Sequence, residues 1–388
     1  MKTVFKNARV ILPNRILYGG ITVEGNRIAE VFQHDSEAAG DHVIDCGGLY
    51  LSPGFIDLHI HGGGGADFMD GTKESVETVL NTHAKHGTTS MLPTTLSSSR
   101  EKVIKALQAI EQVQREWTAG PRILGAHVEG NFFSLIQAGA QDPEYIIPPT
   151  KENTEPIISC VSNIKRISCA PETENALAFA REMSKKGILM SAAHTNASYE
   201  EMEKGAENGF SHMTHLFNGC SIVHSPNYYC GAGAAESALV LEDMAVEMIS
   251  DGRHVPRELL KLVYRIKGSG QINLCTDAMC AADMPEGEYK LGALDVVIRD
   301  QVAVLKDGTS FAGSVCTGDR AVRTMHKEAE VPIYEAVKMM TATPAKLIHV
   351  YEELGSISVG KYADINLFDD DVQIRYTMIN GEEYQNHL

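Results

Sequence analysis

The chain has 388 residues, enough for one large domain with a smaller unit beside it. Apolar residues make up 43% of the chain and charged residues 22%, the balance of an ordinary globular protein. The formal net charge of −17 argues against nucleic acid or an anionic membrane as a partner, and no apolar run approaches the roughly 20 residues of a membrane helix. The first residues make a poor signal peptide, and the eight cysteines include no Cys-x-x-Cys pair. We therefore expect a cytoplasmic protein with reduced thiols.

Both ends of the chain carry strand-like patterns. Near the start these are Val4–Leu12, Ile21–Val31 with a turn at Gly25-Asn26, and Val43–Asp45. Near the end they are Ala363–Phe368 and Ile374–Ile379, followed by the hairpin signal Asn380-Gly381. Their similar character predicts one small β domain built from residues 1–52 and 353–388.

Between these ends, short apolar runs alternate with helical patterns. The helical patterns include Lys73–Lys85, Glu101–Trp117, Glu174–Lys185 and Tyr199–Glu207. The eight apolar runs are Phe55–Ile60, Thr88–Leu92, Ile123–His127, Arg166–Ala170, Ile188–Ala193, Phe210–His215, Ala245–Ile249 and Ile272–Thr276. Eight such units predict an α/β protein in which residues 53–352 form a (β/α)₈ TIM-like barrel, with its active site at the carboxyl ends of the strands.

Residues that can bind metal stand where these predicted strands end. His59 and His61 lie two apart at the end of the first strand, so both imidazoles point the same way. Further candidates follow the third, fifth, sixth and eighth strands, in the order Glu129, His194, His215 and Asp277. Any one of these residues alone is compatible with a structural role. A barrel directs all of them to one mouth, and their joint placement predicts a metal site.

Four imidazoles and a carboxylate can hold one or two divalent ions. Such an ion lowers the pKa of bound water to about 7 and polarises a carbonyl, which makes hydrolysis feasible at neutral pH. Asp277 suits the role of the base that takes a proton from the water and passes it to a leaving amine. The sequence therefore predicts metal-dependent hydrolysis.

Several segments together resemble one family over essentially the whole chain. They are Pro53–Gly62, His127–Gly130, Ala193–Thr195, Thr214–Asn218, Asp251–His254, Thr276–Met279, Phe311–Ser314 and Gly355–Asp364. These segments resemble the amidohydrolase superfamily and, within it, the N-acetylglucosamine-6-phosphate deacetylases. The resemblance implies a barrel with a β-sandwich domain formed by both termini. It also implies removal of the N-acetyl group of N-acetylglucosamine 6-phosphate, which gives glucosamine 6-phosphate and acetate.

The resemblance also assigns roles to residues. Glu129, His194 and His215 would hold the main ion, and the presence of His59 and His61 implies a second ion. Zinc is the first expectation for the metal, with iron, cobalt, manganese and nickel as alternatives. A small-molecule amino sugar phosphate is the expected ligand and a homodimer the expected assembly. The substrate-binding positions implied by the resemblance are Gln141, Asn218, Gly219, His254, Phe311 and Ala312.

The chain departs from the family pattern at three places. Asn131 stands where the family has proline after Glu-Gly, and Gln141 stands where it has a histidine that polarises the scissile carbonyl. The family's phosphate-binding arginine, donated across a dimer interface, has no counterpart in Ile222–Cys230. A bidentate arginine is the usual clamp for phosphate, so this loss bears on the need for a 6-phosphate. Residues that could replace the arginine are His224, Asn227, Tyr228, Tyr229 and His254, together with the backbone amides at Asn218 and Gly219.

Two alternatives follow from these departures. One is the same deacetylation on another N-acetyl sugar, unphosphorylated or of galacto configuration, or on another small amide. The other is a non-catalytic barrel that only binds a ligand. The retained Asp277 argues against the second alternative, because binding alone does not need a base.

Overall fold

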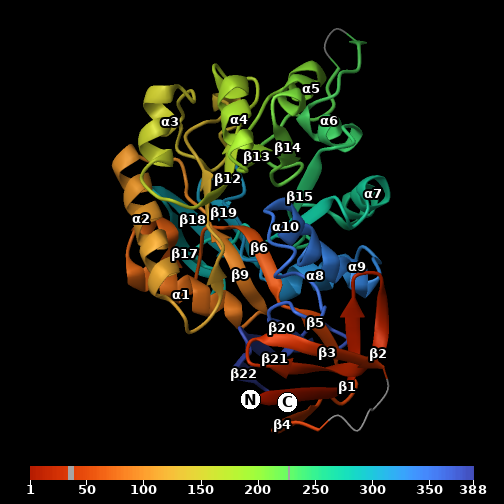
Figure 1. The fold of residues 1–388 in the computed structure, drawn as a ribbon. Helices are drawn as coiled ribbons and strands as arrows, with labels where there is room; N and C mark the ends of the chain where they lie inside the picture. The colour runs from red at the N-terminus through yellow and green to blue at the C-terminus, as the bar shows by residue number, and fades with distance from the viewer. Residues whose placement is uncertain (34–38, 226–227) are drawn as a thin grey trace.

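Strands from both ends of the chain lie in one eight-stranded sheet (Figure 1). The computed structural model describes residues 1–33, 39–225 and 228–388. Seven of the strands run in the order β22-β21-β20-β5-β1-β2-β3, and β4 pairs with β1. Their bounds are β1 Lys2–Leu12, β2 Arg15–Glu24, β3 Arg27–Gln33, β4 His42–Asp45, β5 Tyr50–Pro53, β20 Ile365–Phe368, β21 Ile374–Ile379 and β22 Glu382–Asn386.

This terminal sheet buries one apolar cluster that draws on both ends of the chain. Phe5 and Leu51 from the start pack with Ile365 and Tyr376 from the end, and all four side chains are buried. The rings of Phe5 and Tyr376 meet edge to face with centroids 5.6 Å apart. The two ends of the chain therefore share one sheet and one apolar cluster.

The middle of the chain contains two parallel sheets. One has three strands in the order β10-β9-β6, and the other has six in the order β11-β12-β13-β14-β15-β16. A parallel bridge between Thr94 and His127 links the end of β9 to β11, and the backbone N–H of Asp277 donates to the carbonyl of His59 at 2.9 Å. The bounds are β6 Phe55–Ile60, β9 Thr88–Pro93, β10 Arg122–Ile123, β11 Ala126–Glu129, β12 Ile164–Cys169, β13 Leu189–Ala192, β14 Phe210–Met213, β15 Ala245–Ile249 and β16 Ile272–Cys275.

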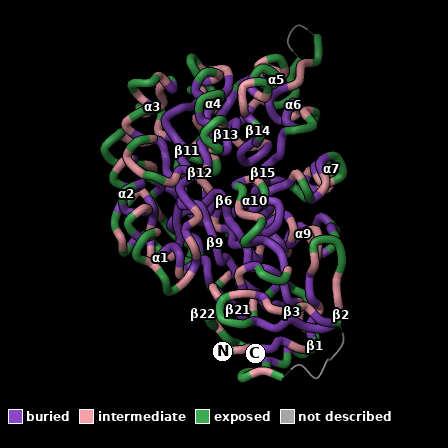
Figure 2. Tube along the Cα trace, viewed as in Figure 1, coloured by how far each residue is buried: buried purple, intermediate pink, exposed green. Residues whose placement is uncertain are grey.

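Helices cover the outer faces of these parallel strands (Figures 1 and 2). In the long helix α2, buried Val103, Leu107, Ile110 and Val113 recur at helical spacing, and Ser99 caps the helix by accepting from the N–H of Lys102. None of the helices in the described residues is long and apolar enough to cross a membrane. Their bounds are α1 Lys73–Ala84, α2 Arg100–Glu116, α3 Lys151–Ile158, α4 Ala176–Lys185, α5 Tyr199–Glu207, α6 Ala234–Val240, α7 Arg257–Lys267, α8 Gly318–Lys327, α9 Ile333–Met339 and α10 Ala342–Leu347.

The structure differs from the predicted elements at two places. The strand expected at Ile123–His127 is divided into β10 and β11 by Gly125, whose φ is 149° and whose missing side chain leaves room for Lys165 and the carbonyl of Asn163. The chain between β16 and α8 also forms an antiparallel three-stranded sheet that was not predicted. Its strands are β17 Gly287–Leu291, β18 Leu294–Arg299 and β19 Val302–Leu305.

Candidate metal centre and active site

The parallel strands bring all six predicted ligand and base residues together. His59 lies within β6 and His61 one residue after it, while Glu129 is the last residue of β11. The other three each stand two residues beyond the end of a strand, His194 after β13, His215 after β14 and Asp277 after β16. The carboxyl ends of the parallel strands therefore converge on one buried site, as the sequence predicts.

Three of these residues have an unusual backbone. His194, His215 and Asp277 have φ values of 43°, 27° and 48°, in the left-handed region that residues other than glycine rarely adopt. Such a conformation costs on the order of 1–3 kcal/mol and persists only where the surroundings fix it. Backbone hydrogen bonds supply part of this restraint, from the N–H of Asp277 to the carbonyl of His59 and from the N–H of Ser134 to the carbonyl of His194, each at 2.9 Å.

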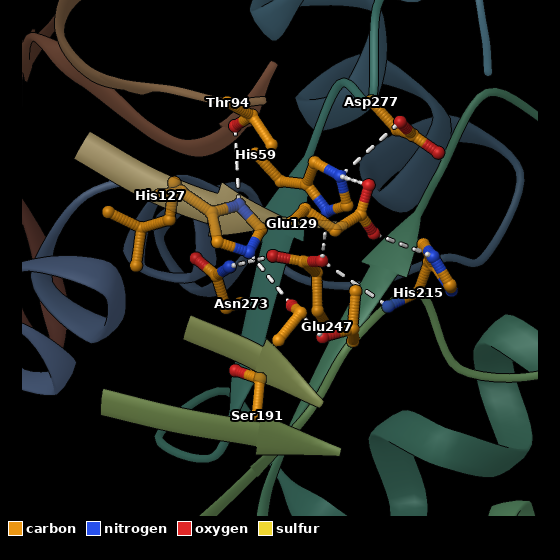
Figure 3. Close-up of polar contacts among 12 residues, drawn as sticks. His59, Thr94, His127, Glu129, Ser191, His215, Glu247, Asn273 and Asp277 are labelled. Carbon is orange, nitrogen blue, oxygen red and sulfur yellow. Dashed lines mark hydrogen bonds and ion pairs between the residues drawn. The ribbon is translucent and has the colours of Figure 1, made fainter. Parts of the chain in front are cut away.

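Glu129 lies between two pairs of imidazoles, and Figure 3 shows one ring of each pair, His59 and His215, beside its carboxylate. Its Oε2 is 3.4 Å from Nε2 of both His59 and His61. Its Oε1 is 3.7 Å from Nε2 of His194 and 3.3 Å from Nε2 of His215. Each carboxylate oxygen of Glu129 thus faces one pair of rings.

The imidazoles are held with their Nε2 atoms turned toward Glu129. Nδ1 of His194 lies 2.9 Å from the carbonyl of Gln137, and Nδ1 of His215 lies 3.0 Å from the carbonyl of Asn218. Nδ1 of His59 lies 2.8 Å from Oε1 of Glu247. An oxygen acceptor at Nδ1 places the proton there and leaves the Nε2 lone pair free for a metal.

The donor atoms fit divalent ions in two sets. His59, His61 and Asp277 form one set, and Glu129, His194 and His215 the other, with the ligand atoms of each set within 4.8 Å of one another. Oε1 of Glu129 is buried and has no hydrogen-bond partner in the described structure, as expected of an atom reserved for a metal. A third group contains His59, Glu247 and Cys275, but burial raises the pKa of the Cys275 thiol well above its ordinary value, which disfavours the thiolate that metals bind.

The two carboxyl groups of the site are charged at neutral pH. Burial raises the pKa of Glu129, but the facing rings of His59, His194 and His215 outweigh burial and hold the pKa well below its ordinary value. Burial also raises the pKa of Asp277, while the rings of His59 and His61 lower it overall. Oδ1 of Asp277 lies 3.2 Å from Nε2 of His61, a member of the same ligand set.

A cavity of about 550 Å³ opens onto these residues. Five of the six expected substrate-binding positions line it, namely Gln141, Asn218, Gly219, His254 and Phe311. Ala312 does not line the cavity, contrary to expectation, because its backbone N–H donates to the carbonyl of Ala303 and its side chain packs in a buried apolar cluster with Leu291 and Val296.

Hydrogen bonds orient two of the lining residues. Oε1 of Gln141 accepts from the N–H of Ser97 at 2.7 Å, so its amide NH₂ faces the site and donates to Oε2 of Glu129 at 3.1 Å. Nδ1 of His254 lies 2.8 Å from Oδ2 of Asp251, and its Nε2 has no partner in the described structure. The Gln141 amide NH₂ thus lies against Glu129, and Nε2 of His254 is a buried nitrogen without a partner among the described residues, in a residue that lines the cavity.

The structure also accounts for Asn131. Its φ of 69° lies outside what proline can adopt, and its side-chain amide donates to the carbonyls of Ser98 and Tyr145 at 2.9 Å each. Asparagine tolerates this backbone conformation better than most residues. The turn after Glu129 is thus held by the Asn131 side chain.

Most of the described side chains that could replace the missing arginine do not line the cavity. His224, Tyr228 and Tyr229 are exposed and are not among the residues that line the cavity, while Asn227 lies outside the described residues. Within the described ranges, no lysine or arginine lines the cavity. His254 and the amides at Asn218 and Gly219 remain the candidate contacts for a negatively charged group.

A buried polar group beneath the site was missed by the sequence analysis. Arg166 on β12, Glu247 on β15 and Asn273 on β16 are each fully buried among the parallel strands. The available signal was a charged residue within an otherwise apolar strand. Strand alternation alone could not tell whether such a residue faces inward, and the partners lie far apart in the chain.

Comparison with known proteins places the chain in a family. The Amidohydrolase family model matches residues 50–384. The chain is 32% identical to the N-acetylglucosamine-6-phosphate deacetylase of Vibrio furnissii, over 97% of this chain and 94% of that protein. It is 30% identical to the N-acetylgalactosamine-6-phosphate deacetylase of Escherichia coli O157:H7, over 86% of this chain and 87% of that protein. The crystal structure of N-acetylglucosamine-6-phosphate deacetylase from Pasteurella multocida superposes with a TM-score of 0.93 at 30% identity, covering 100% of both chains.

The sequence segments, the shared glutamate between two imidazole pairs and these matches agree with one another. The chain belongs to the N-acetylglucosamine-6-phosphate deacetylase family of amidohydrolases.

Proposed function

We propose that this protein removes the N-acetyl group of N-acetylglucosamine 6-phosphate by hydrolysis, giving glucosamine 6-phosphate and acetate. The observation that carries the proposal is Glu129, whose two oxygens face separate imidazole pairs at the mouth where Asp277 also lies. The similarity to named deacetylases over nearly the whole chain supports it.

We also propose the architecture that the sequence predicts. Residues 53–352 would form a (β/α)₈ barrel, and residues 1–52 and 353–388 a β-sandwich domain. The two parallel sheets and the backbone hydrogen bond between Asp277 and His59 support the barrel. The sheet that contains both ends supports the second domain.

In this proposal Glu129, His194 and His215 hold one divalent ion, and His59 and His61 hold a second with Glu129 shared. Zinc is the first choice, with iron, cobalt, manganese or nickel as alternatives. A divalent ion at these ligands polarises a carbonyl and makes water a nucleophile at neutral pH.

The chain's own residues would handle the proton and the substrate. Asp277 takes the proton from the attacking water and returns it to the departing amine. The amide NH₂ of Gln141, turned toward the site by Ser97, donates a hydrogen bond to the acetyl oxygen. His254 and the backbone at Asn218 and Gly219 bind the sugar phosphate.

Acetate release tests this function directly. The metal-loaded protein should release acetate from N-acetylglucosamine 6-phosphate, measured together with the appearance of a free amine. Protein stripped of metal by a chelator should be inactive and should recover when metal is restored. A metal-loaded protein that releases no acetate from any N-acetylhexosamine phosphate would refute the proposal.

The dependence on the 6-phosphate is expected to be moderate. Neutral donors bind a dianion less strongly than a guanidinium, since charge-assisted hydrogen bonds are about twice as strong as neutral ones. We expect kcat/KM to favour the phosphorylated sugar by a factor above 1 and below about 10⁴, the latter near 5.5 kcal/mol. The assay compares N-acetylglucosamine with and without its 6-phosphate. A larger preference would mean that a cation absent from the described cavity wall reads the phosphate.

A second candidate substrate is the galacto epimer. The similarity to an N-acetylgalactosamine-6-phosphate deacetylase favours including it. The ratio of kcat/KM for the two 6-phosphates distinguishes the candidates, and a ratio favouring the galacto compound would reassign the substrate.

We further propose that the protein is a homodimer. Exposed apolar side chains occur on two segments that adjoin cavity residues, with Leu135 and Ile136 before Gly139, and Ile222 and Val223 after Gly219. Exposed apolar groups of this kind are typical of interaction surfaces. Sedimentation velocity measures the assembly, and a monomer at micromolar concentration would contradict the proposal.

A further inference from the structure

A fully buried ion pair lies beneath the ligand set formed by His59, His61 and Asp277. Arg166 and Glu247 are each 0% exposed. Nη1 of Arg166 contacts Oε2 of Glu247, and Nη2 of Arg166 donates to Oε1 at 3.0 Å. Asn273 donates to Oε2 of Glu247 at 3.0 Å. Figure 3 shows Glu247 close to Asn273 and below the ring of His59.

The rest of the Arg166 guanidinium is also satisfied. Its Nε donates to the hydroxyl of Ser191 at 3.0 Å, its Nη2 to the hydroxyl of Thr214 at 2.9 Å, and its Nη1 to the carbonyl of Leu58 at 3.2 Å. Arg166, itself on β12, is therefore tied to β6, β13 and β15 and to Thr214, the residue after β14. Its position is fixed, and so is the position of the carboxylate that it holds.

Glu247 contacts ligands from both sets. Oε1 accepts from Nδ1 of His59 at 2.8 Å and from the backbone N–H of His215 at 3.3 Å. Glu247 is the acceptor of the His59 ring proton within the described structure. His61 differs, because its buried Nδ1 has no hydrogen-bond partner in the same residues.

Stability alone does not explain such a pair. Two buried charges lose hydration, and replacing a buried ion pair by apolar residues of similar size is often neutral or stabilising. A carboxylate at Nδ1 of a metal-binding histidine, by contrast, fixes the ring and increases the basicity of Nε2. The pair therefore has a use at His59 that an apolar core would not supply.

We infer that Glu247, held in place by Arg166, is a positioning residue that fixes His59 and thereby sets the affinity of the ion bound through His59 and His61. The inference rests on the two-ion site of the proposed function. The effect is expected on the second ion, because Glu247 reaches the ring of His59 but only the backbone N–H of His215. The rings of His194 and His215 take their Nδ1 acceptors from backbone carbonyls.

Metal titration of the apoprotein tests the inference. Protein stripped of metal is titrated with Zn²⁺ in equilibrium dialysis, and bound zinc is counted by elemental analysis. The wild type should bind two ions. Glu247→Gln should keep the first ion and bind the second about 10–100-fold more weakly. Glu203→Gln is the matched control, because it makes the same chemical change at an exposed residue of α5. It should titrate like the wild type.

A double-mutant cycle separates positioning from a general structural effect. His59→Asn alone should weaken the second ion. If Glu247 acts through His59, adding Glu247→Gln to His59→Asn should cause no further loss of second-ion affinity. A further loss of the same size as in the wild-type background would overturn the inference.

Glu247→Gln alone leaves Arg166 as a buried charge without its partner carboxylate, and this variant risks misfolding. The combined variant Arg166→Met/Glu247→Gln removes both charges and should show the same weak second ion. Unchanged second-ion affinity in either folded variant would refute the inference while leaving the deacetylase proposal intact. A wild type that binds a single ion would overturn the inference and the two-ion site together, and acetate release would still judge the activity separately.

Discussion

Glu129→Gln should reduce kcat by about 10³-fold or more. The substitution keeps the shape of the side chain but removes the charge that faces four imidazoles at 3.3–3.7 Å. Loss of the charged ligand weakens the binding of both proposed ions. A bound ion contributes several kcal/mol of transition-state stabilisation, and each 1.36 kcal/mol is worth a factor of ten in rate. The measurement is kcat for acetate release, with zinc content determined on the same sample.

Glu203→Gln is the matched control, since Glu203 is an exposed residue of α5 and the chemical change is the same. It should have wild-type activity and metal content. A Glu129→Gln enzyme with near-normal kcat and a full complement of metal would show that this carboxylate does not bridge the site.

Asp277→Asn should lower kcat by about 10²–10⁴-fold, the usual contribution of a general acid or base. The amide retains the shape and cannot accept the proton of the attacking water. The ion held by Glu129, His194 and His215 should remain, because Asp277 belongs to the other ligand set. The checks are kcat, KM and zinc content.

A near-normal kcat for Asp277→Asn would assign proton transfer to another group. His254 is then the next residue to replace, because it lines the cavity and its Nε2 has no partner in the described structure. A large fall in kcat that accompanies loss of both ions would instead make Asp277 a ligand required for metal binding.

The ligand residues could be predicted because each one ends a strand with a clear apolar pattern. His59 and His61 share a face by simple alternation, and barrel topology directs the remaining strand ends to the same place. Predicted helices agree with the structure within two residues at most ends, as with Lys73–Lys85 against α1 and with Tyr199–Glu207, which matches α5.

The features that escaped prediction depend on contacts distant in sequence. Glu247 acts on His59 through a contact that no local pattern reveals, and its role requires Arg166 from a third strand. Ala312 sits between two cavity-lining residues, yet its side chain points into an apolar cluster. The antiparallel strands β17 to β19 come after β16 in the chain. β16 corresponds to the last of the eight strands of the predicted barrel, so the barrel pattern called for no strand after it.

The pairing of β5 with β20 constrains how the chain is made. Leu51 and Pro53 take Leu367 and Ile365 as partners, so β5 pairs with a strand that is synthesised after all the parallel strands. During synthesis, which runs at about 5–20 residues per second, this edge of β5 has no partner until β20 emerges. The parallel strands can pack before then, whereas this sheet closes only after β20 has been made. A nascent chain cut short before β20 would therefore expose a sheet edge, a recognised trigger of aggregation, beside an otherwise assembled active site.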